Sequence, residues 1–309
     1  MKQDITKSQN VDTDYRVKTL HKNLLNLSRR YSLNSRFIVG VFIIVLATVS
    51  ALAAPWISPH SPEHQELLSR LQGPTGSYLL GTDNFGRDIL SRIIWGGRVS
   101  LSVGLLAMVI AVSVGVLVGA ISGYFGRAID AILMRFTELM LVFPAFFLLI
   151  LVVASFQESV RPEDRGMILV PMLGLTSWAV SARIIRGEVL KIKQRDYILA
   201  VHSVGAGNAR IIMRHILPNI VSVIIVSATV RVGVLILVEA GLSFLGLGIQ
   251  QPQSSWGNMV SDGFPYMRQA WWFTVFPGLA IFITVLGFNL IGEGLRDLLD
   301  PRSGKGRAV

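Results

Sequence analysis

The chain has 309 residues, of which 51% are hydrophobic and only 16% are charged. Because a soluble domain usually carries about 25% charged residues, this composition excludes a disordered chain and argues against an ordinary soluble enzyme. The net charge of +10 is compatible with a nucleic-acid binder, but in a chain this apolar it favours loops that face an anionic membrane surface. The absence of cysteine excludes disulfides, thiolate zinc sites and a cysteine nucleophile.

Six long stretches without Asp, Glu, Lys or Arg divide the sequence. A helix needs roughly 20 apolar residues to cross about 30 Å of hydrocarbon, and two of the stretches are too short unless a charged residue is included. We therefore extend the fifth stretch through Arg231 to Val238. A further uncharged segment, 240–261, contains the glycines and the proline of a loop. The six predicted spanning helices lie in the stretches 37–62, 99–126, 139–157, 167–182, 215–230 and 269–292.

The basic residues predict how these helices are oriented. All seven lysines and most arginines fall in segments that are cytoplasmic if the N-terminus is placed in the cytoplasm. This asymmetry is typical of a multi-pass protein of the cytoplasmic (inner) membrane, here with both termini on the cytoplasmic side. The predicted segments are a cytoplasmic tail 1–36, a first transmembrane helix 37–57, an external segment 58–98, a core 99–294 with a cytoplasmic loop 187–215, and a cytoplasmic tail 295–309.

A competing interpretation concerns the first helix. Residues 37–50, followed by Ala51-Leu52-Ala53, have the pattern of a signal-peptide core with a small-residue cleavage site. However, the segment 1–36 is too long for the charged region of a signal peptide, and the apolar run continues to Ile57. A retained transmembrane helix is therefore the favoured interpretation.

Several catalytic motifs are missing from the chain. It contains no G-x-x-x-x-G-K-[ST] phosphate loop, no H-E-x-x-H motif and no nucleophile elbow. We therefore expect that the chain is not an enzyme and does not hydrolyse ATP by itself. His60 and His64, with Glu63 between them, lie in a predicted turn without a nearby fourth ligand, so we predict no metal site there.

The cytoplasmic loop carries the most informative pattern. Asp196 is a candidate N-cap for a short helix that Gly205 or Gly207 ends, and Asn208 can cap a second helix that runs to Pro218. Two short helices that meet at a glycine corner form a compact knob, which suits a groove on a cytosolic partner. The structural alternative is a surface loop that packs on its own bundle.

This segment resembles the E-A-A-x-x-x-G motif of binding-protein-dependent, ATP-driven importers, whose membrane subunits insert the loop into the ATPase. Ala200 and Gly205 match the motif, whereas Leu199 stands in place of its glutamate and Val201 in place of its second alanine. The resemblance implies coupling to the ATPase through residues 195–218, without a salt bridge at position 199. The implied coupling residues are Tyr197, Ile198, Leu199, Ala200, Val201, Gly205, Ala206, Leu217 and Pro218.

Further stretches resemble the peptide/nickel branch of the same family, in particular the C-type permease of dipeptide and oligopeptide importers. The stretch 80–88 reads Leu-Gly-Thr-Asp-Asn-Phe-Gly-Arg-Asp, and 239–248 reads Glu-Ala-Gly-Leu-Ser-Phe-Leu-Gly-Leu-Gly. With Ala54-Pro55-Trp56 after the first helix, the likeness runs from about residue 30 to Pro301. It implies an all-α polytopic membrane protein with the type I importer permease fold, in which an extra N-terminal helix precedes a five-helix core.

The resemblance also implies a function and a set of partners. The chain is expected to be the translocation subunit of an importer of di- or oligopeptides, working with a second homologous permease and an external substrate-binding protein. Two ATP-binding subunits would hold ATP and Mg²⁺, so that this chain holds no cofactor, and no nucleic acid is expected. The same machinery with nickel or glutathione as substrate is an alternative. A proton-coupled secondary transporter is an alternative from another class, although it needs titratable groups at mid-membrane.

The external motifs supply candidates for docking and gating. Thr82 or Asp83 is predicted to cap a helix through residues 89–94. The charged side chains then either pair locally or form a docking rim for an external binding protein. The resemblance implies a short re-entrant segment near the outer gate at residues 240–248. The candidates for docking or gating are Asp83, Arg87, Asp88, Arg92, Ser243 and Phe244.

Two charges and three glycines are notable within the predicted bundle. Arg231 and Glu239 lie two turns apart on one helix face. They predict either a structural ion pair or charges that line the substrate pathway. Gly115, Gly119 and Gly123 recur every four residues, a spacing that predicts close packing of one helix on another. Prolines within the predicted spans also predict kinks, at Pro144, Pro171 and Pro277.

Overall fold

The computed structural model describes residues 35–157 and 165–299. Within these ranges the chain is helical, and its only β-type pairing is a single bridge between Thr82 and Asp88. Five helices are long and apolar enough to span a membrane. These are α2 (Ser35–Leu52), α4 (Ile89–Phe125), α7 (Arg165–Lys193), α10 (Leu217–Phe244) and α12 (Trp271–Leu299).

The sixth predicted span is broken in the middle. It consists of α5 (Arg127–Val142) and α6 (Ala145–Gln157), which meet at an angle of 86°. The span predicted over 139–157 is therefore not one continuous helix, and the break lies at Pro144, where a kink was predicted. Proline lacks an N–H and disfavours a helical backbone at the preceding residue, and Phe143 is accordingly extended, with ψ of 133°. Counted as one span, the pair brings the number of spans to the predicted six.

The spanning helices extend beyond the uncharged stretches that predicted them. Charged residues near a helix end lie outside the hydrocarbon, so hydropathy marks the spanning part of a helix rather than its ends. Pro171 and Pro277, predicted to cause kinks, lie inside α7 and α12. The additional residues are 89–98 of α4, 183–193 of α7, 239–244 of α10 and 293–299 of α12.

The segment 240–261 is not simply the loop that was predicted. It contains the end of α10 and a short helix, α11 (Trp256–Gly263). Ser255 and Asn258 form a capping box, in which each side chain accepts a hydrogen bond from the backbone N–H of the other. This reciprocal cap satisfies two N–H groups that would otherwise lack partners, and it explains why a helix begins here.

Small residues bring α4 and α7 into close contact. A Cβ atom added at Gly119 would lie 2.5 Å from the carbonyl oxygen of Ala182, and one at Gly115 would lie 2.5 Å from the Cβ of Ser181. Gly123 faces Val189 in the same way. The predicted packing role of the three glycines is therefore confirmed.

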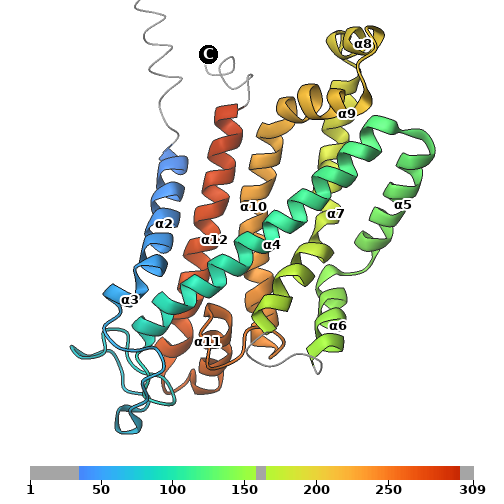
Figure 1. Ribbon diagram of the computed structural model, residues 1–309. Helices are drawn as coiled ribbons and strands as arrows, with labels where there is room; N and C mark the ends of the chain where they lie inside the picture. The colour runs from blue at the N-terminus through green and yellow to red at the C-terminus, as the bar shows by residue number, and fades with distance from the viewer. Residues whose placement is uncertain (1–34, 158–164, 300–309) are drawn as a thin grey trace, which may run out of the picture.

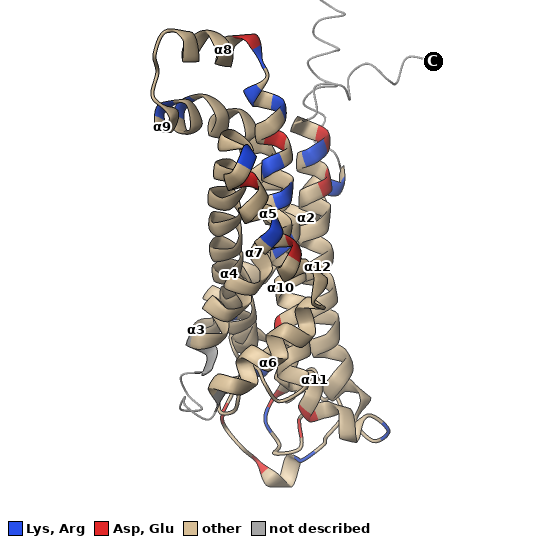
Figure 2. Cartoon of the chain, turned by 90° about the vertical axis from the view of Figure 1, so that its right-hand side faces the viewer, with Lys and Arg blue, Asp and Glu red and all other residues tan. Residues whose placement is uncertain are grey.

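The two ends of the bundle differ (Figure 1). At one end, called the α8 end, α8 (Asp196–Ser203) and α9 (Asn208–Ile211) project beyond the spans, and a π-helical turn, η3 (Ile212–Ile216), leads into α10. The helix α2 begins and α12 ends on this side. Figure 2 shows most of the Lys and Arg residues in the half of the bundle that carries α8. The opposite end holds α3 (Ala54–Ile57), η1 (Leu67–Ser69), α11 and η4 (Phe264–Tyr266).

Candidate functional site

The hairpin of α8 and α9 contains the two predicted short helices, with different capping residues. The second helix, predicted to run to Pro218, ends at Ile211 and is followed by the π-helical turn η3. Arg195 and Gly207 are the N-caps, so that Asp196 and Asn208 are the first residues of their helices. An aspartate in the first turn still stabilises the positive end of a helix. Gly205, with φ of +82°, ends α8 in a backbone conformation that glycine adopts without strain.

The hairpin has one face toward the bundle and one toward solvent. Ile198 is only 3% exposed and packs in a cluster with residues of α4, α7, α9 and α10. By contrast, Leu199 is 56% exposed and Val204 is 83% exposed. Of the nine predicted coupling residues, the exposed ones are Tyr197, Leu199, Ala200, Gly205 and Pro218, whereas Ile198, Val201, Ala206 and Leu217 pack in this cluster.

Helical geometry explains this division. Ile198 and Val201 lie three residues apart and therefore on the same face of α8, which is the face that contacts the bundle. The sequence motif identified the segment but did not separate its two faces. Val204, the most exposed large side chain of the hairpin, was missed because it lies between the motif positions.

Polar contacts attach the hairpin to the long helices. The hydroxyl of Tyr124, near the end of α4, donates to Asn208 Oδ1 at 2.9 Å, and Lys193 Nζ donates to the carbonyl oxygen of Tyr124 at 2.5 Å. Nearby, Arg186 of α7 donates two hydrogen bonds of 2.6 Å to Asp130 of α5. The first bond joins α4 to the base of the hairpin, the second joins α7 to the end of α4, and the ion pair joins α7 to α5. None of these contacts was predicted from the sequence.

At the opposite end, the predicted docking residues are buried. The exposed fractions of Asp83, Arg87, Asp88 and Arg92 are 4% or less. They therefore do not form a docking rim, and the alternative of local pairing is the correct one. Asp88, rather than Thr82 or Asp83, caps α4 by accepting from the backbone N–H of Ser91 at 3.0 Å.

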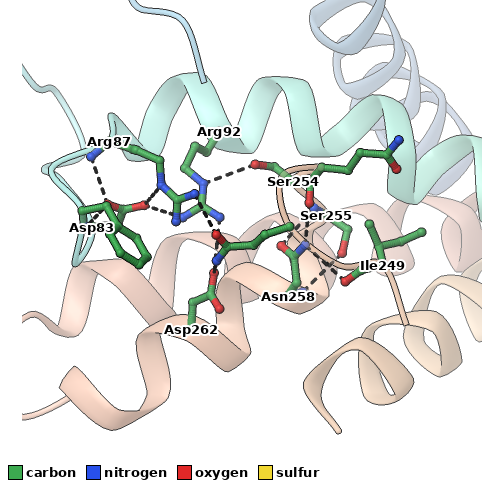
Figure 3. Close-up of polar contacts among 11 residues, drawn as sticks. Asp83, Arg87, Arg92, Ile249, Ser254, Ser255, Asn258 and Asp262 are labelled. Carbon is green, nitrogen blue, oxygen red and sulfur yellow. Dashed lines mark hydrogen bonds and ion pairs between the residues drawn. The ribbon is translucent and has the colours of Figure 1, made fainter. Parts of the chain in front are cut away.

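Asp83 organises the local pairing (Figure 3). Its Oδ1 accepts from the backbone N–H groups of Phe85, at 2.7 Å, and Arg87, at 2.9 Å. Its Oδ2 accepts from Arg87 Nε at 2.6 Å and from Arg92 Nη1 at 2.5 Å. Two guanidinium groups thus share one buried carboxylate, which is acceptable only where further acceptors are present.

The further acceptors come from distant parts of the chain. Arg87 Nη1 donates to Gln251 Oε1 at 3.1 Å, and Arg92 Nη2 contacts Asp262 Oδ2 at 3.4 Å. Arg92 Nε donates to Ser254 Oγ at 3.2 Å. Because about 160 residues separate these partners, no local pattern indicated Gln251, Ser254 or Asp262.

Glu239 is completely buried in α10, but it does not pair with Arg231. Ser243 Oγ donates to its Oε1 at 2.7 Å, and Ser100 Oγ to its Oε2 at 3.4 Å. Eight helical residues span about 12 Å along the axis, which is too far for the two oppositely charged side chains of Arg231 and Glu239 to meet. Among the described residues no ion pair joins them. Of the two predicted alternatives the structural pair is therefore wrong, and charges that line the substrate pathway stay a prediction.

The two gating candidates have different environments. Ser243 is buried, and its hydroxyl accepts from the backbone N–H of Ile249 at 3.1 Å, which secures the segment after α10. Phe244 is exposed and meets Phe264 edge to face, with 5.6 Å between the ring centroids. His60, considered for a metal, lies 3.6 Å from Asp88 Oδ2 instead. Within the described ranges no group of three His, Asp or Glu side chains has the geometry of a metal site.

Comparison with known proteins identifies the family. Residues 115–305 match the binding-protein-dependent transport system inner membrane component, and residues 27–74 match the N-terminal transmembrane domain of oligopeptide transport permease C. These matches confirm the resemblance found in the sequence, and the all-helical architecture fits the type I importer permease fold.

Curated relatives cover most of the chain. The dipeptide transport system permease protein DppC of Alkalihalophilus pseudofirmus is 41% identical over 87% of this chain and 86% of its own length. DppC of Bacillus subtilis is 40% identical, over 89% and 84%. The oligopeptide transport system permease protein OppC of Haemophilus influenzae is 38% identical, over 89% and 87%. The chain therefore belongs to the family of multi-pass inner membrane components of binding-protein-dependent transport systems.

Proposed function

We propose that the chain is the translocation subunit of an ATP-driven importer of di- or oligopeptides. It forms half of the substrate pathway, and a second, homologous permease forms the other half. Two ATP-binding subunits and an external substrate-binding protein complete the assembly. ATP and Mg²⁺ bind to the ATPase subunits, and this chain holds no cofactor. The names of the relatives, which are dipeptide and oligopeptide permeases, support peptides over nickel or glutathione.

The α8 hairpin is the observation that carries this proposal. It projects from the bundle with Leu199 and Val204 exposed, while Ile198 secures its base. Exposed apolar side chains on a well-packed base are typical of a contact with a partner protein. The basic residues around the hairpin favour a cytoplasmic location for the α8 end, and with it for both termini.

The contacts at the base of the hairpin suggest how the ATPase drives transport. When ATP closes the two ATPase subunits, α8 moves with them. The Tyr124–Asn208 hydrogen bond passes this displacement to α4, and the Arg186–Asp130 ion pair links α7 to α5. A partner that binds one state of the bundle more tightly than the other shifts the equilibrium between the inward-open and outward-open states.

Purification of the tagged chain in mild detergent tests the assembly. We expect mass spectrometry to find a second permease and two ATPase subunits in the purified complex. Recovery of this chain alone, under conditions that keep a known importer intact, would refute the proposal. It would also favour the proton-coupled alternative.

Uptake into proteoliposomes then tests the substrate and the energy source. With the binding protein outside and ATP inside, we expect accumulation of a radiolabelled dipeptide that persists when a protonophore is added. Matched assays with nickel and with glutathione serve as controls. Accumulation of one of these in place of peptides would replace the substrate assignment and leave the importer assignment intact.

A further inference from the structure

Five side chains form a closed ring at the end of the bundle opposite α8 (Figure 3). Each side chain is hydrogen-bonded to the next one in the ring. The order is Asp83, Arg87, Gln251, Asp262 and Arg92, and Arg92 closes the ring with a hydrogen bond to Asp83. Two arginines balance two aspartates, so the ring carries no net formal charge. A neutral, mutually hydrogen-bonded group of this kind is the form in which charges are tolerated away from water.

The bond lengths divide the ring into two halves. The inner half, Asp83, Arg87 and Arg92, is held by bonds of 2.6 and 2.5 Å. The outer half contains Gln251 and Asp262, and Gln251 Nε2 donates to Asp262 Oδ2 at 2.8 Å.

The contacts that join the halves are all longer. The two that belong to the ring measure 3.1 Å from Arg87 to Gln251 and 3.4 Å from Arg92 to Asp262. Outside the ring, Arg92 Nε also donates to Ser254 Oγ at 3.2 Å, which holds α4 to the segment before α11. Each half therefore stays internally bonded if the two joining contacts and the Arg92–Ser254 contact separate.

The two halves belong to different parts of the bundle. The inner half lies in the turn before α4 and in its first residues, whereas Asp262 lies on α11, which packs mainly on α12 and α10. The other end of α11 is attached to α4 by Trp256, whose Nε1 donates to the carbonyl oxygen of Ile93 at 2.9 Å. The helix α11 is thus joined to α4 at both ends, by Trp256 at its start and by the ring near its end.

Gln251 is the exposed member of the ring and its only uncharged one. It lies beside Pro252 and Gln253, which are also exposed. An amide that rotates into solvent moves no charge between environments, so its removal from the ring is the least costly way to open it. Its departure breaks the Arg87 contact and frees Asp262 from one of its two partners in the ring.

We propose that the ring is an outer latch and that Gln251 is the positioning residue through which the external binding protein releases it. Contact with the binding protein draws Gln251 away from Arg87. The outer half then separates from α4, and α11 pivots at Trp256. This inference rests on the proposed importer function, because it requires the binding protein.

The ATPase activity of the complete importer in proteoliposomes tests the latch, with the binding protein and dipeptide present or absent. In Gln251→Ala, we expect the activity without binding protein to rise about tenfold, as expected if roughly 1.4 kcal/mol of hydrogen bonding no longer favours the latched state. Because the basal ATPase activity is already high, the factor by which loaded binding protein stimulates it falls. Gln253→Ala, which changes a neighbouring exposed amide, is the matched control and retains the behaviour of the wild type.

A second measurement follows the opening directly. The chain contains no cysteine, so Ser254→Cys introduces one thiol into this chain at a position that is 8% exposed. Because it also replaces the hydroxyl that Arg92 contacts, its labelling rate is compared with and without binding protein in the same variant. We expect a membrane-impermeant maleimide added outside to modify it faster when loaded binding protein and ATP are present. If Gln251→Ala does not assemble, Gln251→Asn, whose shorter side chain does not reach both partners, replaces it.

The outcomes separate the latch from the importer itself. Low basal activity and full stimulation in Gln251→Ala, with no change in the labelling of Ser254→Cys, would overturn the latch. A lower melting temperature without loss of coupling would show a purely structural role and would also overturn it. Failure of the wild-type complex to respond to any binding protein would instead refute the proposed function on which the latch rests.

Discussion

Replacing Leu199 with alanine tests whether the exposed face of α8 contacts an ATPase subunit. Complete burial of a leucine side chain contributes about 1.5–3 kcal/mol. Because Leu199 is 56% exposed in the isolated chain, the part still available for burial by a partner contributes about 1 kcal/mol. The truncation should therefore weaken binding of the ATPase subunit by about fivefold, whereas the stability of the permease stays nearly unchanged.

The neighbouring residue supplies a control of opposite character. Ile198 is 3% exposed, so Ile198→Ala leaves a cavity inside the hairpin and should cost about 2–5 kcal/mol of folding free energy. The assay is titration of the detergent-solubilised permease with a fluorescently labelled ATPase subunit, together with thermal unfolding of each variant. An unchanged Kd for Leu199→Ala would refute the reasoning, as would a loss of stability equal to that of Ile198→Ala.

Three further predictions concern residues described above. Gly205→Val forces a β-branched residue into a backbone with φ of +82°, which costs about 1–3 kcal/mol of conformational free energy. It should abolish uptake while the protein is still inserted in the membrane. Normal uptake would contradict the coupling role of the hairpin. Gly119→Leu should separate α4 from α7 and lower the melting temperature by an amount equivalent to about 1–3 kcal/mol. Gly187→Ala, with no atom within 4 Å of the added Cβ, should leave the melting temperature unchanged. Equal effects of the two substitutions would show that the close contact between α4 and α7 does not determine the stability. Arg92→Met removes a positive charge that neutralises the carboxylates of Asp83 and Asp262, and should lower the free energy of unfolding by about 3–5 kcal/mol. Adding Asp83→Asn removes one of these negative charges and should restore part of the lost stability. A double variant no more stable than Arg92→Met would show that the two side chains are not coupled.

Hydropathy predicted the number and order of the spans because a charged residue is costly in hydrocarbon. Spanning segments therefore appear in the sequence as long stretches without charged residues. It did not predict where α4 begins, because the helix continues past Arg92 and Arg98 into a region where charges have partners or water. Pro144 was a visible local signal for a kink. The 86° angle between α5 and α6 depends on their neighbours and had no such signal.

The candidate sites also contain some features that local sequence signals predicted and others that they did not. The two short helices were predictable because glycine corners and polar residues at helix starts are local signals, although each N-cap lies one residue earlier than predicted. The burial of Ile198, and the contacts of Arg92 with Ser254 and Asp262, depend on packing between segments that are distant in sequence. Arg231 and Glu239 show the converse error. Eight residues turn a helix by about 80° more than two full turns and advance it by about 12 Å, so neither the direction of the two side chains nor their separation along the axis favours contact.

The helix α4 is longer than the membrane is thick, and this length has a mechanical consequence. Its 37 residues correspond to about 55 Å, whereas the hydrocarbon layer is about 30 Å thick, so the helix must lie obliquely and extend past both surfaces. It contains no proline, and it carries Arg92 near one end and Tyr124 near the other, about 48 Å apart along the axis. Such a helix behaves as a single stiff rod, and tilting it moves its two tips in opposite directions. An event on one side of the membrane therefore reaches the other side mechanically, without a chain of intermediate rearrangements.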